Sequence, residues 1–256
     1  MVSLAHTCAY LSRQAYNDVP DLNRIRQVWI ARYSRNGTQA FVSRSIAGHL
    51  QLNRVVFDDY MFLVFRGTDE IVDIDVDRKY TKADFQFGGR VHSGFLQALE
   101  EIRSDLQEIM IEHRDKKWIF TGHSLGAALA LLAASIWNPS AAYLYGCPRV
   151  GNKVFLKTIK CLVLNFRNRG DVVTRVPPPT SFIQIWSSLR HNRKPTLYRQ
   201  AKRIIRLAGP SLGHSITSYE AATLEPKGNP WWLTYSPYPC PIPTKQDSSP
   251  YQNAKS

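Results

Sequence analysis

Apolar positions along most of the chain follow two patterns, one typical of helices and one typical of buried strands. Three stretches repeat apolar residues at helical spacing, which predicts helices over 1–16, 94–112 and 125–137. Short apolar or β-rich runs typical of strands occupy 39–46, 60–65, 118–121, 141–145 and 161–166. A further helix is expected near 152–159. Strands that alternate with helices predict an α/β fold with a central, mostly parallel or mixed sheet flanked by helices.

The C-terminal part has a different composition. Seven of the fifteen prolines lie from Pro226 onward, mixed with tryptophan and tyrosine. So much proline does not form a helix, and the aromatic residues suit a segment wrapped over a folded domain. A chain of 256 residues fits one large domain. We therefore expect a single domain over 1–225, followed by a Pro- and aromatic-rich wrap and loose tail over 226–256.

Composition narrows the class of protein further. Apolar residues make up 44% of the chain, which excludes wholesale disorder. The longest apolar stretch, 125–137, is too short to span a bilayer, and the N-terminus lacks the basic region of a signal peptide. We expect a protein that is cytoplasmic or peripheral to a membrane. The cysteines form no C-x-x-C pair, so we expect free thiols rather than a zinc site: Cys8, Cys147, Cys161 and Cys240.

The net charge of +13 favours anionic partners, either membrane surfaces or nucleic acids. Eight Lys or Arg and no acidic residue lie between Asp171 and Glu220. Apolar residues among these charges predict a basic amphipathic helix over 198–207 that contacts an anionic lipid surface, or alternatively a solvated basic face packed on the sheet. The candidate interface residues are Arg199, Lys202, Arg203 and Arg206. Nucleic acid is not expected, because no nucleic-acid-binding fold accompanies the charge, and the sequence does not fix the oligomeric state.

A G-x-S-x-G pentapeptide spans residues 122–126. It follows an apolar strand directly and opens a helix, which is the strand–turn–helix context of a nucleophile elbow. Side chains at either flanking position would collide with the strand or the helix. The pattern predicts Ser124 as a nucleophile, the alternative being a serine in a turn that only connects two elements.

A serine hydroxyl becomes a good nucleophile only when a base takes its proton and an acid orients that base. In catalytic triads built on a G-x-S-x-G turn, the serine comes first along the chain, then the acid and then the histidine. The acid predicted here is Asp171, because no other acidic residue lies between Ser124 and His214. Two histidines follow it. His191 lies in the basic run 190–194, whereas His214 precedes an expected helix, so we assign His214 as the base.

Four stretches carry a family likeness, namely 65–68 together with Asp73, 91–95, 121–127 and 145–152. They resemble the R-G-[ST] loop, the H-x-G-F helix entry, the T-G-H-S-L-G-[GA] elbow and the G-x-P-R-V-G-[ND] strand end of the class 3 lipase family, which includes the fungal triacylglycerol lipases. With Asp171 and His214 in order, the likeness spans most of 1–225. It implies an α/β-hydrolase fold and ester hydrolysis through a Ser-Asp-His triad and an acyl-enzyme, without a cofactor.

The same resemblance implies roles for residues around the nucleophile. Thr68 and the amide of Leu125 would form the oxyanion hole, and Asp73 would brace the oxyanion loop unless it is a plain surface carboxylate. No metal is expected. Although 69–77 is rich in acids, counting from Asp73 as position one puts Arg78 and Asp84 where an EF-hand needs glycine and glutamate.

In related lipases a lid lies between the oxyanion loop and the H-x-G-F motif, which corresponds to 69–91 here. Phe85 and Phe87 stand beside a pair of glycines and suit a small flap. The alternative is a hairpin turn with the phenylalanines buried.

Taken together, the sequence predicts a serine carboxylic-ester hydrolase that acts on lipid acyl esters, as a triacylglycerol lipase or a phospholipase A does. The basic region favours phospholipid. Two alternatives stay open: a soluble-ester hydrolase of the feruloyl esterase type, and a catalytically silent lipase-like module that binds acidic partners through 190–206.

Overall fold

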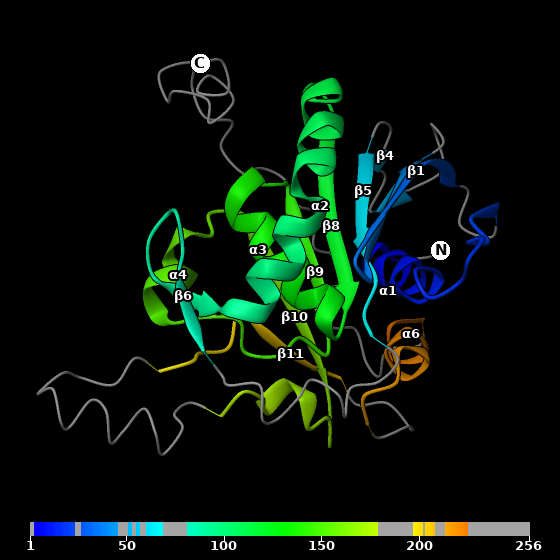
Figure 1. Ribbon diagram of the computed structural model, residues 1–256. Helices are drawn as coiled ribbons and strands as arrows, with labels where there is room; N and C mark the ends of the chain where they lie inside the picture. The colour runs from blue at the N-terminus through cyan, green and yellow to red at the C-terminus, as the bar shows by residue number, and fades with distance from the viewer. Residues whose placement is uncertain are drawn as a thin grey trace, which may run out of the picture.

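The computed structural model describes residues 3–23, 27–45, 51–52, 55–56, 60–68, 81–178, 197–201, 203–207 and 213–224. Predictions that involve Asp73, Lys202, His191, most of the expected lid and the segment 226–256 lie outside these residues. Helices cover both faces of a central sheet in the described part (Figure 1). This confirms the predicted α/β architecture.

The central sheet has seven strands in the order β1-β2-β5-β8-β9-β10-β11. Their bounds are β1 Gln27–Arg35, β2 Thr38–Ser45, β5 Tyr60–Phe65, β8 Lys117–His123, β9 Ala141–Tyr145, β10 Leu162–Asn168 and β11 Ile204–Leu207. β1, β2 and β5 pair antiparallel, whereas β5, β8, β9, β10 and β11 pair parallel. All six residues of β5 are buried, because helices cover this strand on both faces. A two-stranded ladder of β3 (Gln51–Leu52) and β4 (Val55–Val56) lies apart from this sheet.

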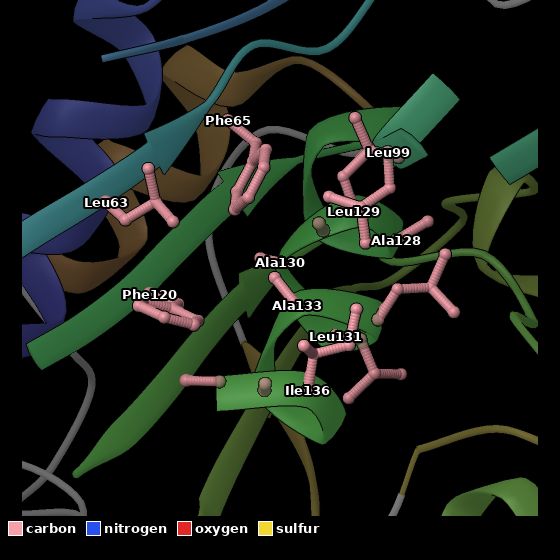
Figure 2. Close-up of a cluster of buried hydrophobic side chains, with 14 of the residues drawn as sticks. Leu63, Phe65, Leu99, Phe120, Ala128, Leu129, Ala130, Leu131, Ala133 and Ile136 are labelled. Carbon is pink, nitrogen blue, oxygen red and sulfur yellow. The ribbon is translucent and has the colours of Figure 1, made fainter. Parts of the chain in front are cut away.

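The helices of the described part lie in two layers, one on each face of the sheet (Figure 1). α2 (Ser93–Glu112) and α3 (Leu125–Trp137) pack on one face, while α1 (Leu4–Gln14) and α6 (Ile216–Leu224) pack on the other. Figure 2 shows α3 against the sheet, with Leu63 of β5 and Phe120 of β8 near its alanines. The small alanine side chains let α3 approach the sheet closely, which fixes the position of its first residues.

α2 begins with a histidine cap. The Nδ1 atom of His92 accepts a hydrogen bond from the amide of Gly94 at 3.2 Å, and its ring stacks on Phe95 at 4.2 Å. Burial lowers the pKa of His92 to about 4, so the ring is neutral and can accept. The H-x-G-F motif therefore serves to start this helix.

The predicted basic helix over 198–207 is wrong. Ile204–Leu207 forms the strand β11, parallel to β10. Ile205 and Leu207 are buried and alternate with the exposed Ile204 and Arg206, which is the period of a strand. This segment is instead the last strand of the described sheet, with one basic residue, Arg206, on its exposed face.

Residues 82–92 form a hairpin. Its strands are β6 (Lys82–Asp84) and β7 (Arg90–His92), and Phe85 at the turn is buried edge-to-face against Phe155, with ring centroids 5.2 Å apart. Phe155 belongs to α4 (Lys153–Thr158). Phe87 is 47% exposed. Of the two expectations for this segment, the hairpin with a buried phenylalanine describes Phe85 but not Phe87.

Cys8 and Cys147 are buried free thiols, Cys161 is also buried, and Cys240 lies outside the described residues. Within the same ranges, no helix is both long and apolar enough to cross a membrane.

Candidate active site

Ser124 lies at a tight turn between β8 and α3. Its backbone has φ +57° and ψ −123°, a conformation that is strained for a residue with a side chain. The flanking glycines allow the turn. A Cβ atom on Gly122 would lie 2.4 Å from the carbonyl carbon of Gly126, and one on Gly126 would lie 2.2 Å from the carbonyl oxygen of Phe65. The sequence therefore folds here into a nucleophile-elbow geometry.

Asp171 and His214 form a buried pair. The Nδ1 atom of His214 lies 2.8 Å from Oδ2 of Asp171, whose residue is only 1% exposed. The amide of Val173 donates to Oδ1 at 2.9 Å and the hydroxyl of Tyr219 donates to Oδ2 at 2.5 Å. Burial and then the charge of Asp171 raise the pKa of Tyr219, so its hydroxyl stays protonated and donates. The carboxylate is thus held in place from three sides.

Gly146 joins this pair to the serine turn. It follows β9 with φ +61°, and a Cβ atom there would lie 2.8 Å from Cε1 of His214 and 3.0 Å from Oδ2 of Asp171. The amide of Ser124 donates to the carbonyl of the preceding residue, Tyr145, at 3.0 Å. The imidazole of His214 therefore lies against the backbone of the strand next to Ser124.

Three polar atoms around this turn are buried without a hydrogen-bond partner: Oγ of Ser124, Nε2 of His214 and Oγ1 of Thr68. No hydrogen bond joins the serine to the histidine. Leaving a buried polar group unpaired costs about 1–3 kcal/mol, and such groups gather at sites that bind or transform a ligand. Nδ1 of His214 is bound to Asp171, so Nε2 is the nitrogen left to act as a base.

The predicted oxyanion-hole residues Thr68 and Leu125 lie close to the serine turn in the topology, whereas the predicted interface residues do not form a helix. Thr68 comes three residues after β5, which leaves the sheet at the same edge as β8 because Phe65 and Gly122 are register partners. Leu125 is the first residue of α3. Arg199 binds the backbone of Gly151, with its amide 2.8 Å from the carbonyl, so the described interface candidates do not share one helix face.

His123 also contacts the catalytic candidates, although sequence reasoning did not single it out. Its Nε2 atom lies 2.6 Å from the carbonyl oxygen of His214, and its Nδ1 lies 2.9 Å from the hydroxyl of Tyr16. Burial, and then the nearby His214, lower the pKa of His123 to about 3, so the ring is neutral. Nε2 then carries the proton and donates to the carbonyl, while Nδ1 accepts from Tyr16. The ring ties the loop of His214 to the serine turn.

Tyr219 and Gly146 were also not predicted as site residues from the sequence. The sequence signal for Gly146 was only its place in the stretch 145–152, and nothing in the sequence pointed to Tyr219. Both act through residues distant in the chain.

Comparisons with known proteins agree with this geometry. Residues 62–181 match the profile of the family described as lipase (class 3). A lipase of Rhizopus niveus is 35% identical over 137 residues, which cover 46% of this chain and 35% of that protein. A phospholipase A1-II 1 of Oryza sativa subsp. indica is 39% identical over 110 residues, covering 38% of this chain and 28% of that protein. This chain thus spans about a third of the length of these relatives.

Among solved structures, a lipase of Rhizopus microsporus var. chinensis superposes with a TM-score of 0.54 at 25% identity, over 69% of this chain and 71% of that one. Lipase II of Rhizopus niveus superposes with a TM-score of 0.52 at 26% identity, over 69% and 71%. By its fold, its motifs and these matches, the chain is similar to the class 3 lipase family over residues 62–181 and has the α/β-hydrolase fold.

Proposed function

We propose that this chain is a serine carboxylic-ester hydrolase that acts on acyl esters of lipids. The observation that carries the proposal is the unpaired, buried Oγ of Ser124 on a strained turn, together with a buried Asp171–His214 pair whose Nε2 is also unpaired. The relatives named lipase and phospholipase A1 support lipid esters as the substrate class.

In the proposed mechanism, Nε2 of His214 takes the proton of Ser124 as Oγ attacks the ester carbonyl. Asp171 keeps the proton on Nδ1 and stabilises the imidazolium that forms. The amide of Leu125, with the amide and hydroxyl of Thr68, stabilises the negative charge on the carbonyl oxygen. His214 then gives its proton to the departing alcohol, and an acyl-enzyme remains.

The second half of the reaction repeats the first with water in place of the serine. His214 takes a proton from water, whose oxygen attacks the acyl carbonyl, and the carbon–oxygen bond to Ser124 breaks. The proton returns to Oγ, and the carboxylic acid leaves. No metal or other cofactor takes part in the proposed steps.

Turnover of p-nitrophenyl butyrate and of a medium-chain triglyceride by the purified chain tests this proposal. We expect activity in the parent protein and a loss of at least about 10³-fold in Ser124→Ala, since the nucleophile is gone. Ser104→Ala, on the exposed face of α2, is the matched control and keeps full activity. Equal activity in Ser124→Ala would remove the serine from the mechanism, and a parent protein inactive on all esters would favour the silent binding module.

A further inference from the structure

Two arginines lie side by side where β10 and β11 end. Arg167 of β10 and Arg206 of β11 are register partners in a parallel ladder, so their side chains share one face of the sheet. Like charges in opposite positions destabilise a sheet. Neither side chain forms an ion pair anywhere in the described part of the chain. This pair therefore costs stability without local compensation.

Arg149 and Arg175 extend the pair to a cluster. Nη1 of Arg149 donates to the carbonyl oxygen of Pro177 at 2.8 Å and to that of Arg175, which fixes the turn after Asp171. The pKa of Arg149 is lowered by burial and then by the charges of Arg167 and Arg175. These guanidinium groups are thus close enough to repel one another.

Nothing in the neighbouring sequence neutralises this arginine cluster (Arg149, Arg167, Arg175 and Arg206). No acidic residue occurs between Asp171 and Glu220. The carboxylate of Asp171 is already occupied by His214, Val173 and Tyr219. Proteins retain such unfavourable local arrangements mainly where function requires them. An anion from outside the chain would compensate the charge.

The strand register places the cluster beside the serine. His123, Tyr145, Phe166 and Ile205 are successive partners across β8, β9, β10 and β11. The next residue in each strand is Ser124, Gly146, Arg167 and Arg206. Adjacent strands are about 4.8 Å apart, so the backbones of Ser124 and Arg167, two strands apart, are separated by roughly 10 Å. An extended arginine covers much of that distance, and the phosphate of a glycerolipid lies only a few bonds from its ester carbonyl.

We propose that Arg167, Arg206 and Arg175 bind the phosphate of an anionic acyl glycerolipid whose ester is presented to Ser124. The planar guanidinium group donates paired hydrogen bonds that match phosphate oxygens. Arg149 is a positioning residue, because it holds the backbone of the Arg175 turn. This inference rests on the proposed esterase function for the identity of its ligand, and it assigns that enzyme a preference for phosphate-bearing lipids.

Binding to a catalytically inert protein tests the site without relying on turnover. Dibutyryl phosphatidate, which is water-soluble, and the neutral dibutyrylglycerol are titrated calorimetrically into Ser124→Ala protein. Adding Arg167→Gln or Arg206→Gln should weaken phosphatidate binding about tenfold or more, because one charge-assisted contact is lost, and leave dibutyrylglycerol unaffected. Arg114→Gln removes the same charge from an exposed side chain between α2 and β8, at the opposite end of β8 from Ser124. It should change neither affinity.

Each other outcome of these titrations decides against the site. Unchanged affinity in Arg167→Gln and Arg206→Gln would overturn it, and an equal loss in Arg114→Gln would reduce it to general attraction of anions. A titration with inorganic phosphate distinguishes a site for a lipid head group from a site for free phosphate. We expect it to bind more weakly than dibutyryl phosphatidate, and equal affinity would contradict a lipid ligand.

Turnover separates this inference from the proposed function. In the otherwise unmutated protein, Arg167→Gln and Arg206→Gln should raise KM for dibutyryl phosphatidate about tenfold and leave kcat/KM for p-nitrophenyl butyrate unchanged. Equal losses on both substrates would mean a structural defect rather than a binding site. Absence of all turnover, with arginine-dependent binding intact, would refute the esterase but not the phosphate site.

Discussion

The imidazole of His123 donates from Nε2 to the backbone carbonyl oxygen of His214 across 2.6 Å. The two residues are 91 positions apart, yet their ring centroids are only 4.5 Å apart. The residue before the proposed nucleophile therefore holds the loop that carries the proposed base. This contact helps to set the relative position of Ser124 and His214, and it does not involve Oγ of Ser124 or Nε2 of His214.

Removing that contact should slow the reaction while leaving substrate binding intact. We expect His123→Leu to lower kcat for p-nitrophenyl butyrate by roughly 10–100-fold, because small displacements of a catalytic base cost about that much. KM should change little. His123→Gln retains a donor and should recover part of the loss, while His113→Leu, beyond the end of α2, serves as the control. A wild-type kcat in His123→Leu would show that the His214 loop needs no such tie.

We expect the hydroxyl of Tyr219 to contribute to catalysis through its hydrogen bond to Asp171. Tyr219→Phe removes one donor from the carboxylate and leaves the aromatic packing of the ring in place. A buried hydrogen bond to a charged group contributes about 1.5–3 kcal/mol, so we expect the free energy of unfolding to fall by about that amount and kcat to fall about tenfold. Kinetics and urea unfolding measure the two effects. Tyr33→Phe, on the far edge strand β1, is the control and should change neither quantity. An unaltered kcat in Tyr219→Phe would contradict the prediction and would mean that His214 and Val173 suffice to hold Asp171.

A methyl group at position 146 should disable the site. Gly146→Ala would bring Cβ into the imidazole of His214 and impose a positive φ on a residue with a side chain. Gly37→Ala is the matched control, because Gly37 has φ +82° and no atom within 4 Å of the added Cβ. We expect both variants to lose about 1 kcal/mol of stability from backbone strain. Only Gly146→Ala should also lose ester turnover, and retention of full activity there would contradict the packing of His214 against the strand.

Stability should depend on pH through the buried histidines. His92 has its pKa lowered from 6.5 to about 4 in the folded protein, because burial disfavours its charged form. Between these values the unfolded chain binds a proton that the folded chain does not, so the free energy of unfolding falls as the pH drops from about 6.5 to about 4. The stabilisation from neutral His92 is fully present above this window. His123, with a pKa of about 3, extends the loss to lower pH.

His92→Asn isolates one of these protons. Asparagine keeps an acceptor for the first turn of α2 but does not titrate. The free energy of unfolding, measured in urea at a series of pH values, should depend less steeply on pH in His92→Asn. The difference in slope should correspond to about one proton over the same window. An unchanged slope would assign the acid sensitivity to other groups.

The sequence predicted those parts of the fold that local apolar patterns determine. The runs 60–65, 125–137 and 141–145 coincide with β5, α3 and β9, because each is a continuous buried element bounded by turn residues. β11 was predicted as part of a helix. Its four residues are too few to separate a period of two from one of 3.6, and the surrounding basic residues suit either structure.

In the candidate site too, local motifs and chain order predicted some residues, whereas others are brought together only by the fold. The G-x-S-x-G motif and the order of residues along the chain singled out Ser124, Asp171 and His214. His123 occupies a position that the motif leaves open. Tyr219 and Gly146 matter only because the fold brings α6 and the end of β9 to Asp171, and no local pattern encodes such a contact.

The most direct test of the central claim is covalent labelling of Ser124 by a fluorophosphonate probe, located by peptide mass spectrometry. Only an activated serine reacts quickly with such a probe. We expect one label per chain, on the peptide that contains Ser124, and a labelling rate at least about a hundredfold lower in His214→Ala, where the base is missing. Absence of label on Ser124 in the parent protein, or equally fast labelling in His214→Ala, would contradict activation of Ser124 by His214.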